Sequence, residues 1–155
     1  DGNRYYITGS GGAAYRSRRT ADEFEALDTR VSEPLRGVWG TGNNNVYTVG
    51  LERLVLRFSN RWRRVDPDDL AQVPRVFFID ITGTSGDDVT LVGWGGTVAH
   101  FDGMGWVQQE TEVDRDLRGV WSDPVTGTTF AVGADGTILR RDPPPPPVEE
   151  EMPPM

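Results

Sequence analysis

The segment Leu35–Trp39 reads LRGVW, and the same five letters return at Leu117–Trp121. Between these copies, the segment Phe78–Thr82 (FIDIT) stands at the corresponding distance from its own downstream glycine. Apolar residues around these segments alternate with a period of two, which favours β-strands over helices. A recurring strand segment of this kind predicts a protein assembled from similar units.

Four glycines define the length of the unit. Each ends a β-rich run, and the intervals between them are 41, 43 and 40 residues: Gly9, Gly50, Gly93 and Gly133. The register extends beyond the glycines, because an apolar residue stands five positions after each of them: Ala14, Val55, Val98 and Ile138. Agreement at several offsets makes a chance similarity implausible.

Each complete unit reads as four short strands joined by turn-forming loops. We expect strands over 35–40, 46–50, 54–58 and 62–66 in the second unit, and over 77–82, 89–93, 97–101 and 105–110 in the third. A four-stranded unit of about 40–45 residues is the period of a β-propeller blade. The sequence therefore predicts an all-β fold of about four antiparallel propeller blades, with repeats of 40–43 residues.

The organisation of the chain follows from this period. We expect propeller blades over 1–142, in units of about 1–33, 34–76, 77–116 and 117–142. The segment 143–155 begins with five prolines, which cannot donate to a sheet, and is predicted to be a disordered Pro- and Glu-rich tail. The charged segment 16–33 is expected to form a long loop or a short helical turn, and 66–75 to connect two blades.

The first and last units are incomplete. The first lacks an inner strand, and the last lacks an outer strand because Pro143 stands where it would begin. Incomplete blades leave unpaired edges, which are costly or adhesive. Three explanations are open: the chain belongs to a larger propeller whose remainder is another chain or was removed, two copies close a ring of about eight blades, or the terminal strands pair with each other. We slightly favour the first.

The pattern resembles a known group of repeats. The resemblance rests on these segments: Leu35–Gly40, Val46–Gly50, Val89–Gly96, His100–Trp106 and Leu117–Gly136. They are similar to a bacterial β-propeller repeat related to the Asp-box (sialidase-type) propellers and to the photosystem II assembly-factor-like propellers. The Asp-box is matched only in part, at Phe101–Trp106, and in that family it is a structural turn. The resemblance implies a propeller over roughly residues 4–142 and an extracytoplasmic or secreted location.

Composition argues against several classes of protein. The formal net charge is −8 at pH 7, so the chain gains no general attraction to a phosphate backbone, and nucleic acid is not an expected partner. There is no cysteine, which excludes disulfides and thiolate metal sites. No apolar stretch approaches the roughly 18 residues that a membrane span requires.

Residues for catalysis are scarce. His100 is the only histidine, and it lies on a predicted strand, where histidine is more often packed than catalytic. One histidine without cysteine does not make a zinc site. The loop carboxylates, such as Asp87 and Asp88, lack the spacing of a calcium loop. We therefore expect no enzyme, no catalytic residue, no metal and no cofactor.

Four residues are candidates for binding. Arg36 and Arg118 occupy equivalent places on predicted inner strands, and Asp80 lies at the place between them. Inner strands line the channel of a propeller, so one interpretation is a site for an anionic or carboxylate-bearing ligand. The other, which we favour, is a set of ion pairs between neighbouring blades. Trp94 stands in a hairpin turn, where it has little to pack against, and is the best single candidate for an interaction residue.

The sequence thus predicts a non-catalytic protein-binding or assembly scaffold. The expected partner is a protein, which includes another chain or copy completing the propeller. One alternative is a glycan-binding or sialidase-like glycan-processing propeller. It would be favoured if Arg36, Asp80 and Arg118 converged on an open channel mouth with unpaired charges. A second alternative is a structural subunit of a surface assembly or filament.

Overall fold

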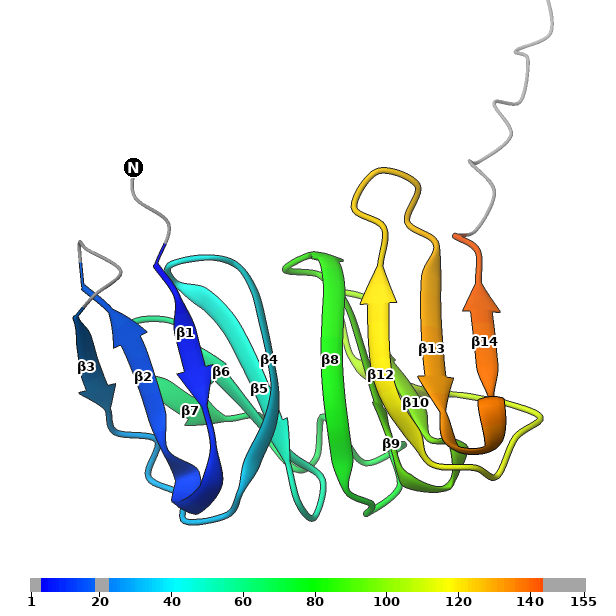
Figure 1. Ribbon diagram of the computed structural model, residues 1–155, viewed down its shortest axis with the longest axis horizontal. Helices are drawn as coiled ribbons and strands as arrows, with labels where there is room; N and C mark the ends of the chain where they lie inside the picture. Colours follow the sequence, from blue (N-terminus) through cyan, green and yellow to red (C-terminus); the bar gives the residue numbers. More distant parts are fainter. Residues whose placement is uncertain (1–3, 19–22, 144–155) are drawn as a thin grey trace, which may run out of the picture.

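The computed structural model describes residues 4–18 and 23–143. These residues form four antiparallel β-sheets, which follow one another in chain order from one end of the molecule to the other (Figure 1). Within them the helical segments are three short 3₁₀ turns: Ser10–Gly12, Trp94–Gly96 and Ala134–Gly136. No helix in these ranges is long and apolar enough to cross a membrane. The prediction of an all-β fold is confirmed.

Each sheet is built from consecutive strands hydrogen-bonded to one another. The first sheet holds β1 (Tyr6–Thr8), β2 (Ala14–Ser17) and β3 (Phe24–Leu27). The second holds β4 (Leu35–Gly42), β5 (Asn45–Gly50), β6 (Leu54–Phe58) and β7 (Trp62–Arg64). The third holds β8 (Phe78–Ser85), β9 (Asp88–Gly93), β10 (Val98–Phe101) and β11 (Trp106–Gln109). The fourth holds β12 (Leu117–Ser122), β13 (Thr129–Gly133) and β14 (Ile138–Arg141).

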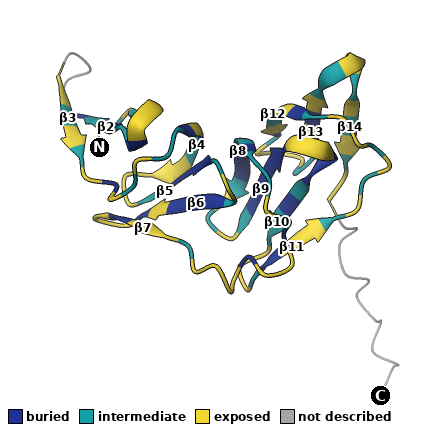
Figure 2. Cartoon of the chain, turned by 90° about the horizontal axis from the view of Figure 1, so that it is seen from below, coloured by how far each residue is buried: buried dark blue, intermediate teal, exposed yellow. Residues whose placement is uncertain are grey.

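The sheets are arranged along an arc. Figure 2 shows β4, β8 and β12 towards the inside of this arc, and β7 and β11 towards its outside. The inner strands are neighbours, because β8 contacts both β4 and β12. Side chains at the beginning of these three strands are therefore brought close together, although they are far apart in the sequence.

The strand predictions agree with the structure. All eight strands expected in the second and third units are present, with ends shifted by at most three residues. The end units are incomplete as expected. In the register of the repeated glycines, β1 corresponds to β5 and β14 corresponds to β6, so the first sheet lacks an inner strand and the fourth lacks an outer one among the described residues. The end sheets do not pair with each other, so closure by the terminal strands is wrong for this part of the chain.

The prediction of a loop or helical turn over 16–33 is wrong for residues 16–17 and 24–27, which lie in strands, and agrees with the structure over 28–33. β2 continues to Ser17, and β3 occupies Phe24–Leu27 and pairs with it in an antiparallel register. Arg16 stands opposite Glu25 on the neighbouring strand, and the two side chains form a hydrogen-bonded ion pair. Opposite charges facing each other across a ladder stabilise strand pairing. The exposed outer strand β3 was therefore not predicted, because the segment around it is charged and lacks a clear apolar pattern.

A tight turn follows the glycine that ends the second strand of each blade unit. At Gly96 the turn requires φ of +69°, and a Cβ would lie 1.9 Å from the carbonyl oxygen of Val113, so only glycine fits. The second sheet has Arg53 at this place, with φ of +61°. Its guanidinium donates hydrogen bonds to the carbonyl oxygens of Leu70 and Val73, both at 3.0 Å. These two bonds offset the strain of a left-handed backbone on a side-chain-bearing residue.

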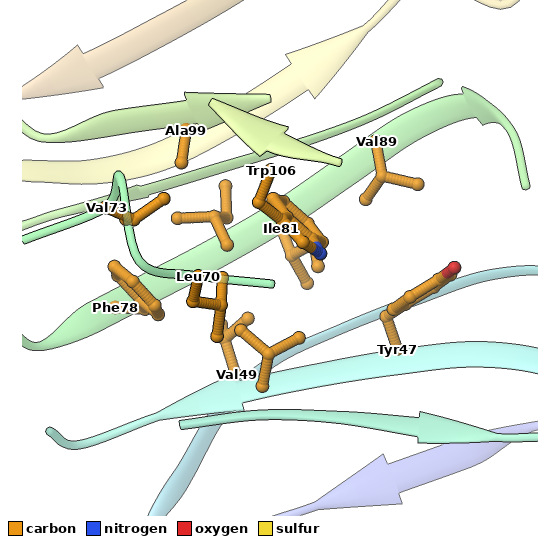
Figure 3. Close-up of a cluster of buried hydrophobic side chains, with 11 residues drawn as sticks. Tyr47, Val49, Leu70, Val73, Phe78, Ile81, Val89, Ala99 and Trp106 are labelled. Carbon is orange, nitrogen blue, oxygen red and sulfur yellow. The ribbon is translucent and has the colours of Figure 1, made fainter. Parts of the chain in front are cut away.

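The largest core lies between the second and third sheets (Figure 3). Tyr47 and Val49 on β5 and Val89 on β9 belong to this core, and all three are almost fully buried. The predicted connector 66–75 does more than join the two sheets, because its Leu70 and Val73 are buried in the same core. A connector that supplies core side chains fixes the distance between the sheets as well as linking them.

The contact between the third and fourth sheets is more polar. Its buried apolar cluster contains only Val92, Leu117 and Ala131. The side chain of His100 on β10 lies there, 17% exposed, with its Nδ1 3.2 Å from the hydroxyl of Thr90 and its Nε2 3.5 Å from Asp88. Arg141 of β14 approaches the same Asp88 carboxylate at 3.6 Å. Burial, and after it the charge of Arg141, lowers the pKa of His100, while Asp88 and Asp102 oppose the shift.

Truncation of the central core should destabilise the fold strongly. Leu91→Ala removes a fully buried side chain from the core between the second and third sheets, and we expect the free energy of unfolding to fall by about 2–5 kcal/mol. Val107→Ala at a half-exposed position of the third sheet is the control, with an expected change below about 0.5 kcal/mol. Urea unfolding followed by tryptophan fluorescence measures both. Equal losses in the two variants would contradict the assigned core.

Acid should loosen the contact between the third and fourth sheets. The folded state lowers the pKa of His100 below the unfolded value of about 6.5, so the unfolded chain binds the proton more readily. The contribution of neutral His100 to the stability of the folded state is therefore complete above about pH 6.5. It is lost as the pH falls towards the pKa that His100 has in the folded state. We expect urea unfolding to give a lower free energy at pH 5.5 than at pH 7.5. The variant His100→Gln should remove this difference, and an unchanged difference would refute the assignment.

Candidate binding site

A pocket lies where the inner strands begin. Arg36, Ile79 and Arg118 are the second residues of β4, β8 and β12, and they line one wall of it. The remaining lining residues come from the turns and connectors beside these strands: Leu51, Phe77, Trp94 and Asp116. The volume is about 540 Å³. The structure therefore brings three of the four predicted binding residues, Arg36, Arg118 and Trp94, to one concave place.

Aromatic and aliphatic side chains form the floor of the pocket. The Trp94 ring meets Phe77 edge-on, with ring centroids 4.1 Å apart and an interplanar angle of 71°. The sequence predicts a tryptophan with little to pack against, and Phe77 supplies the packing that was not foreseen. Trp94 is nevertheless 46% exposed, so one part of the ring remains available to a ligand. A rigid, half-exposed indole is a favourable anchor for a bound apolar group.

Backbone and carboxylate hydrogen bonds hold the Trp94 turn in place. The Trp94 N–H donates to the carbonyl oxygen of Phe77 at 3.0 Å. The next N–H, of Gly95, donates to the Asp116 carboxylate at 3.0 Å. One oxygen of the Asp116 carboxylate is thereby engaged by the turn. Two connections that do not involve the ring thus fix the turn that carries the indole.

The two arginines keep their donors available. Arg36 and Arg118 are exposed, and neither forms an ion pair or a side-chain hydrogen bond with another described residue. The favoured interpretation, ion pairs between neighbouring blades involving Asp80, is therefore wrong for the part of the chain that is described. An unpaired guanidinium presents five N–H donors in a planar fork that matches a carboxylate.

Asp80 does not line the pocket. One of its carboxylate oxygens accepts the N–H of Ile81 at 2.9 Å, and the other accepts the N–H of Val120 on β12 at 3.0 Å. Asp80 also occupies space that glycines leave on both sides. A Cβ on Gly37 would lie 2.7 Å from the Asp80 Cα, and a Cβ on Gly119 would lie 3.9 Å from an Asp80 carboxylate oxygen. Asp80 thus connects neighbouring inner strands. Its repeat equivalents are these two glycines, whereas Ile79 is the equivalent of the arginines.

The repeat register contains the residues that sequence reasoning missed. Ile79 stands at the same place in its strand as Arg36, and Leu51 at the same place in its turn as Trp94. Phe77 and Asp116 each precede the first residue of an inner strand. Three positions of the repeat therefore line the pocket: the second residue of an inner strand, the residue before that strand, and the turn residue after the repeated glycine. Each position contributes residues from more than one unit. Reading all residues at those positions, rather than charged and aromatic residues alone, would have found the whole lining.

This lining suits binding better than catalysis. Asp116 is the single carboxylate in the pocket, and one of its oxygens is already occupied by a backbone N–H. Among the described residues no group of three or more histidine, cysteine or acidic side chains is placed to hold a metal ion. Two free guanidinium groups beside an aromatic floor can bind a ligand that carries carboxylates and an apolar group.

Comparisons with known proteins find the fold in solved structures. No protein-family model matches the chain, and no curated protein does. YCF48 from Cyanidioschyzon merolae matches with a TM-score of 0.68 and 17% identity, covering 91% of this chain and 50% of that one. A structure of YCF48 bound to D1 peptide matches with a TM-score of 0.69 and 16% identity, covering 92% and 47%. A Nidogen/Laminin complex matches with a TM-score of 0.62 and 20% identity, covering 91% and 61%.

These likenesses establish the architecture of the chain. At 16–20% identity they show the fold alone, and that fold is the β-propeller, as the repeats predict. The chain spans 47–61% of the length of these neighbours. The four sheets are blades of a β-propeller, with the pocket at the edge where its inner strands begin.

Proposed function

We propose that the chain is a non-catalytic propeller module that binds a protein segment carrying acidic and apolar side chains. The observation that carries the proposal is the pair of unpaired arginines, Arg36 and Arg118, on the rim of a pocket floored by Phe77 and Trp94. Arginine and tryptophan are the side chains that most often dominate the energy of protein interfaces. In this pocket the two arginines and Trp94 lie together and are accessible.

The size and setting of the pocket favour a peptide segment as the ligand. A volume of about 540 Å³ accommodates a few side chains, and the inner strands that surround it are held by Asp80 and by the sheet contacts. A preformed site of this kind binds an extended segment without the cost of ordering its own loops. Two of the structural neighbours were solved as a YCF48–D1 peptide complex and a Nidogen/Laminin complex, which supports a protein ligand.

Glycan processing is less well supported. Hydrolysis of a glycoside generally requires two carboxyl groups flanking one bond. Asp80 is engaged by two backbone N–H groups and faces away from the pocket lining, which leaves Asp116 as its single carboxylate. Neither a carboxylate pair nor the convergence of all three charged candidates is present in the pocket. The extracytoplasmic setting that the repeat resemblance implies is part of the proposal and is compatible with a protein partner.

Removing either arginine should weaken peptide binding. The probe is a fluorescein-labelled decapeptide in which aspartate alternates with leucine and phenylalanine, and fluorescence polarisation measures its Kd. Each of Arg36→Ala and Arg118→Ala should raise Kd about tenfold, since each removes a charge-assisted contact to a carboxylate. Arg63→Ala, at an exposed arginine outside this pocket and without an ion pair in the described structure, should leave Kd unchanged. An equal Kd for a decapeptide with lysine in place of aspartate would contradict the proposal.

Asp80 should prove structural rather than ligand-binding. Asp80→Ala leaves the N–H of Val120 without its partner, and we expect the free energy of unfolding to fall by about 1–3 kcal/mol. The Kd of the acidic peptide should stay within about twofold of the unaltered protein, because the carboxylate does not line the pocket. A tenfold change in Kd with unchanged stability would show instead that Asp80 contacts the ligand.

A further inference from the structure

Each end of the arc exposes one apolar sheet face. The forward face of a sheet is defined here as the face directed towards the next sheet along the chain, and the rear face as the opposite one. Eight of the twelve large apolar residues exposed in the described structure lie on just two such faces. The forward face of the fourth sheet carries Trp121, Phe130, Val132 and Ile138, and the rear face of the first sheet carries Tyr5, Ile7, Tyr15 and Phe24.

The forward face of the fourth sheet repeats a face that is covered inside the same chain. In the repeat register its residues correspond to four residues of the second sheet that pack against the third sheet: Trp39, Tyr47, Val49 and Val55. Val49 and Val55 are fully buried, whereas their counterparts Val132 and Ile138 are 47% and 71% exposed. Within residues 4–18 and 23–143, a following sheet covers the second sheet and none covers the fourth, which accounts for the difference.

The uncovered face already has the geometry of the covered one. Trp121 stacks on Phe130 with ring centroids 6.5 Å apart and an interplanar angle of 20°, and Trp39 stacks on Tyr47 at 6.4 Å and 26°. Arg140 lies over the Phe130 ring as Arg57 lies over Tyr47, at 6.0 and 5.3 Å. In the covered copy, the Trp39 indole fits against Gly83 of the next inner strand. No strand of the described residues opposes the Trp121 ring.

The rear face of the first sheet is the complementary case. Its four residues correspond in the repeat to residues of the second sheet that are buried against the first sheet: Val46, Thr48, Leu56 and Trp62. The contact is direct, because the Thr48 hydroxyl lies 3.3 Å from that of Thr8. We call the contact between two neighbouring sheets a joint. In the described chain, each joint therefore packs the forward face of one sheet against the rear face of the next. One face of each kind is left uncovered, at opposite ends of the arc (Figures 1 and 2).

We propose that the forward face of the fourth sheet binds the rear face of the first sheet of a second copy of this chain. A second copy offers the matching face in the repeat register that joins the sheets within one chain. Because each copy carries one face of each kind, two arcs meeting at two equivalent joints leave no apolar end uncovered. The chain spans about half the length of the YCF48 structures, so two copies supply the residues of a propeller of that size. This pairing is independent of the peptide pocket.

The mass in solution tests the pairing. Sedimentation velocity of the 155-residue chain should show a closed pair of copies. Trp121→Glu on the forward face and Tyr15→Glu on the rear face each place a charge in every joint, and each variant alone should sediment as a monomer. An equimolar mixture of the two variants should recover a pair, because one joint between an unaltered forward face and an unaltered rear face remains possible.

Matched controls separate the pairing from misfolding and from the pocket. Trp94→Glu makes the same substitution at the other half-exposed tryptophan, outside both end faces, and should leave the pair intact. Circular dichroism should show the same β-sheet content in all variants, and the two end-face variants should keep the Kd of the acidic peptide. A monomer at all concentrations, an open-ended series of larger assemblies, or a Tyr15→Glu variant that still pairs with itself would overturn the proposal.

Discussion

The packing of one sheet's forward face on the next sheet's rear face is the interaction on which the structure depends. A three- or four-stranded sheet of this size cannot bury its apolar residues alone, and stacking neighbours creates the core. Val49, Val89 and Leu91 are fully buried because the second and third sheets meet there. Their exposed counterparts at the ends of the arc show that burial is a property of the joint and not of the single blade.

The candidate site is a consequence of the same stacking. The joints bring β4, β8 and β12 side by side, and so gather residues at 36, 79 and 118 that belong to three different units. Asp80 tightens this arrangement by accepting a hydrogen bond from the neighbouring strand, in space that Gly37 and Gly119 leave open. The residues that shape the pocket and those that line it thus alternate along the same strands, one position apart.

Much of this could be predicted from the sequence, because the repeat carries long-range information. The strands, the incomplete end units and the equivalence of Arg36 with Arg118 follow from a common register. Trp94 was selected as a turn residue, and its place beside the two arginines was not predicted. Asp80 was misassigned because a one-residue offset moves a side chain to the other face of a strand. β3 escaped detection because its stability comes from pairing with β2, including the ion pair of Arg16 with Glu25, and not from an apolar pattern. The burial of Leu70 and Val73 likewise depends on sheets that approach them from both sides.

Arg53 has a consequence for how such blades can be exchanged between proteins. Three of the repeated turns use glycine at this place, whereas this one carries an arginine whose guanidinium donates to the carbonyl oxygens of Leu70 and Val73. The second blade and the segment that follows it are therefore connected by two side-chain hydrogen bonds. Transplanting the blade without that segment would leave Arg53 in a left-handed conformation without its two acceptors. Transplanting the segment beside a glycine turn would leave the carbonyl oxygens of Leu70 and Val73 without the guanidinium donor. A blade exchange that keeps both bonds should therefore carry the chain as far as Val73.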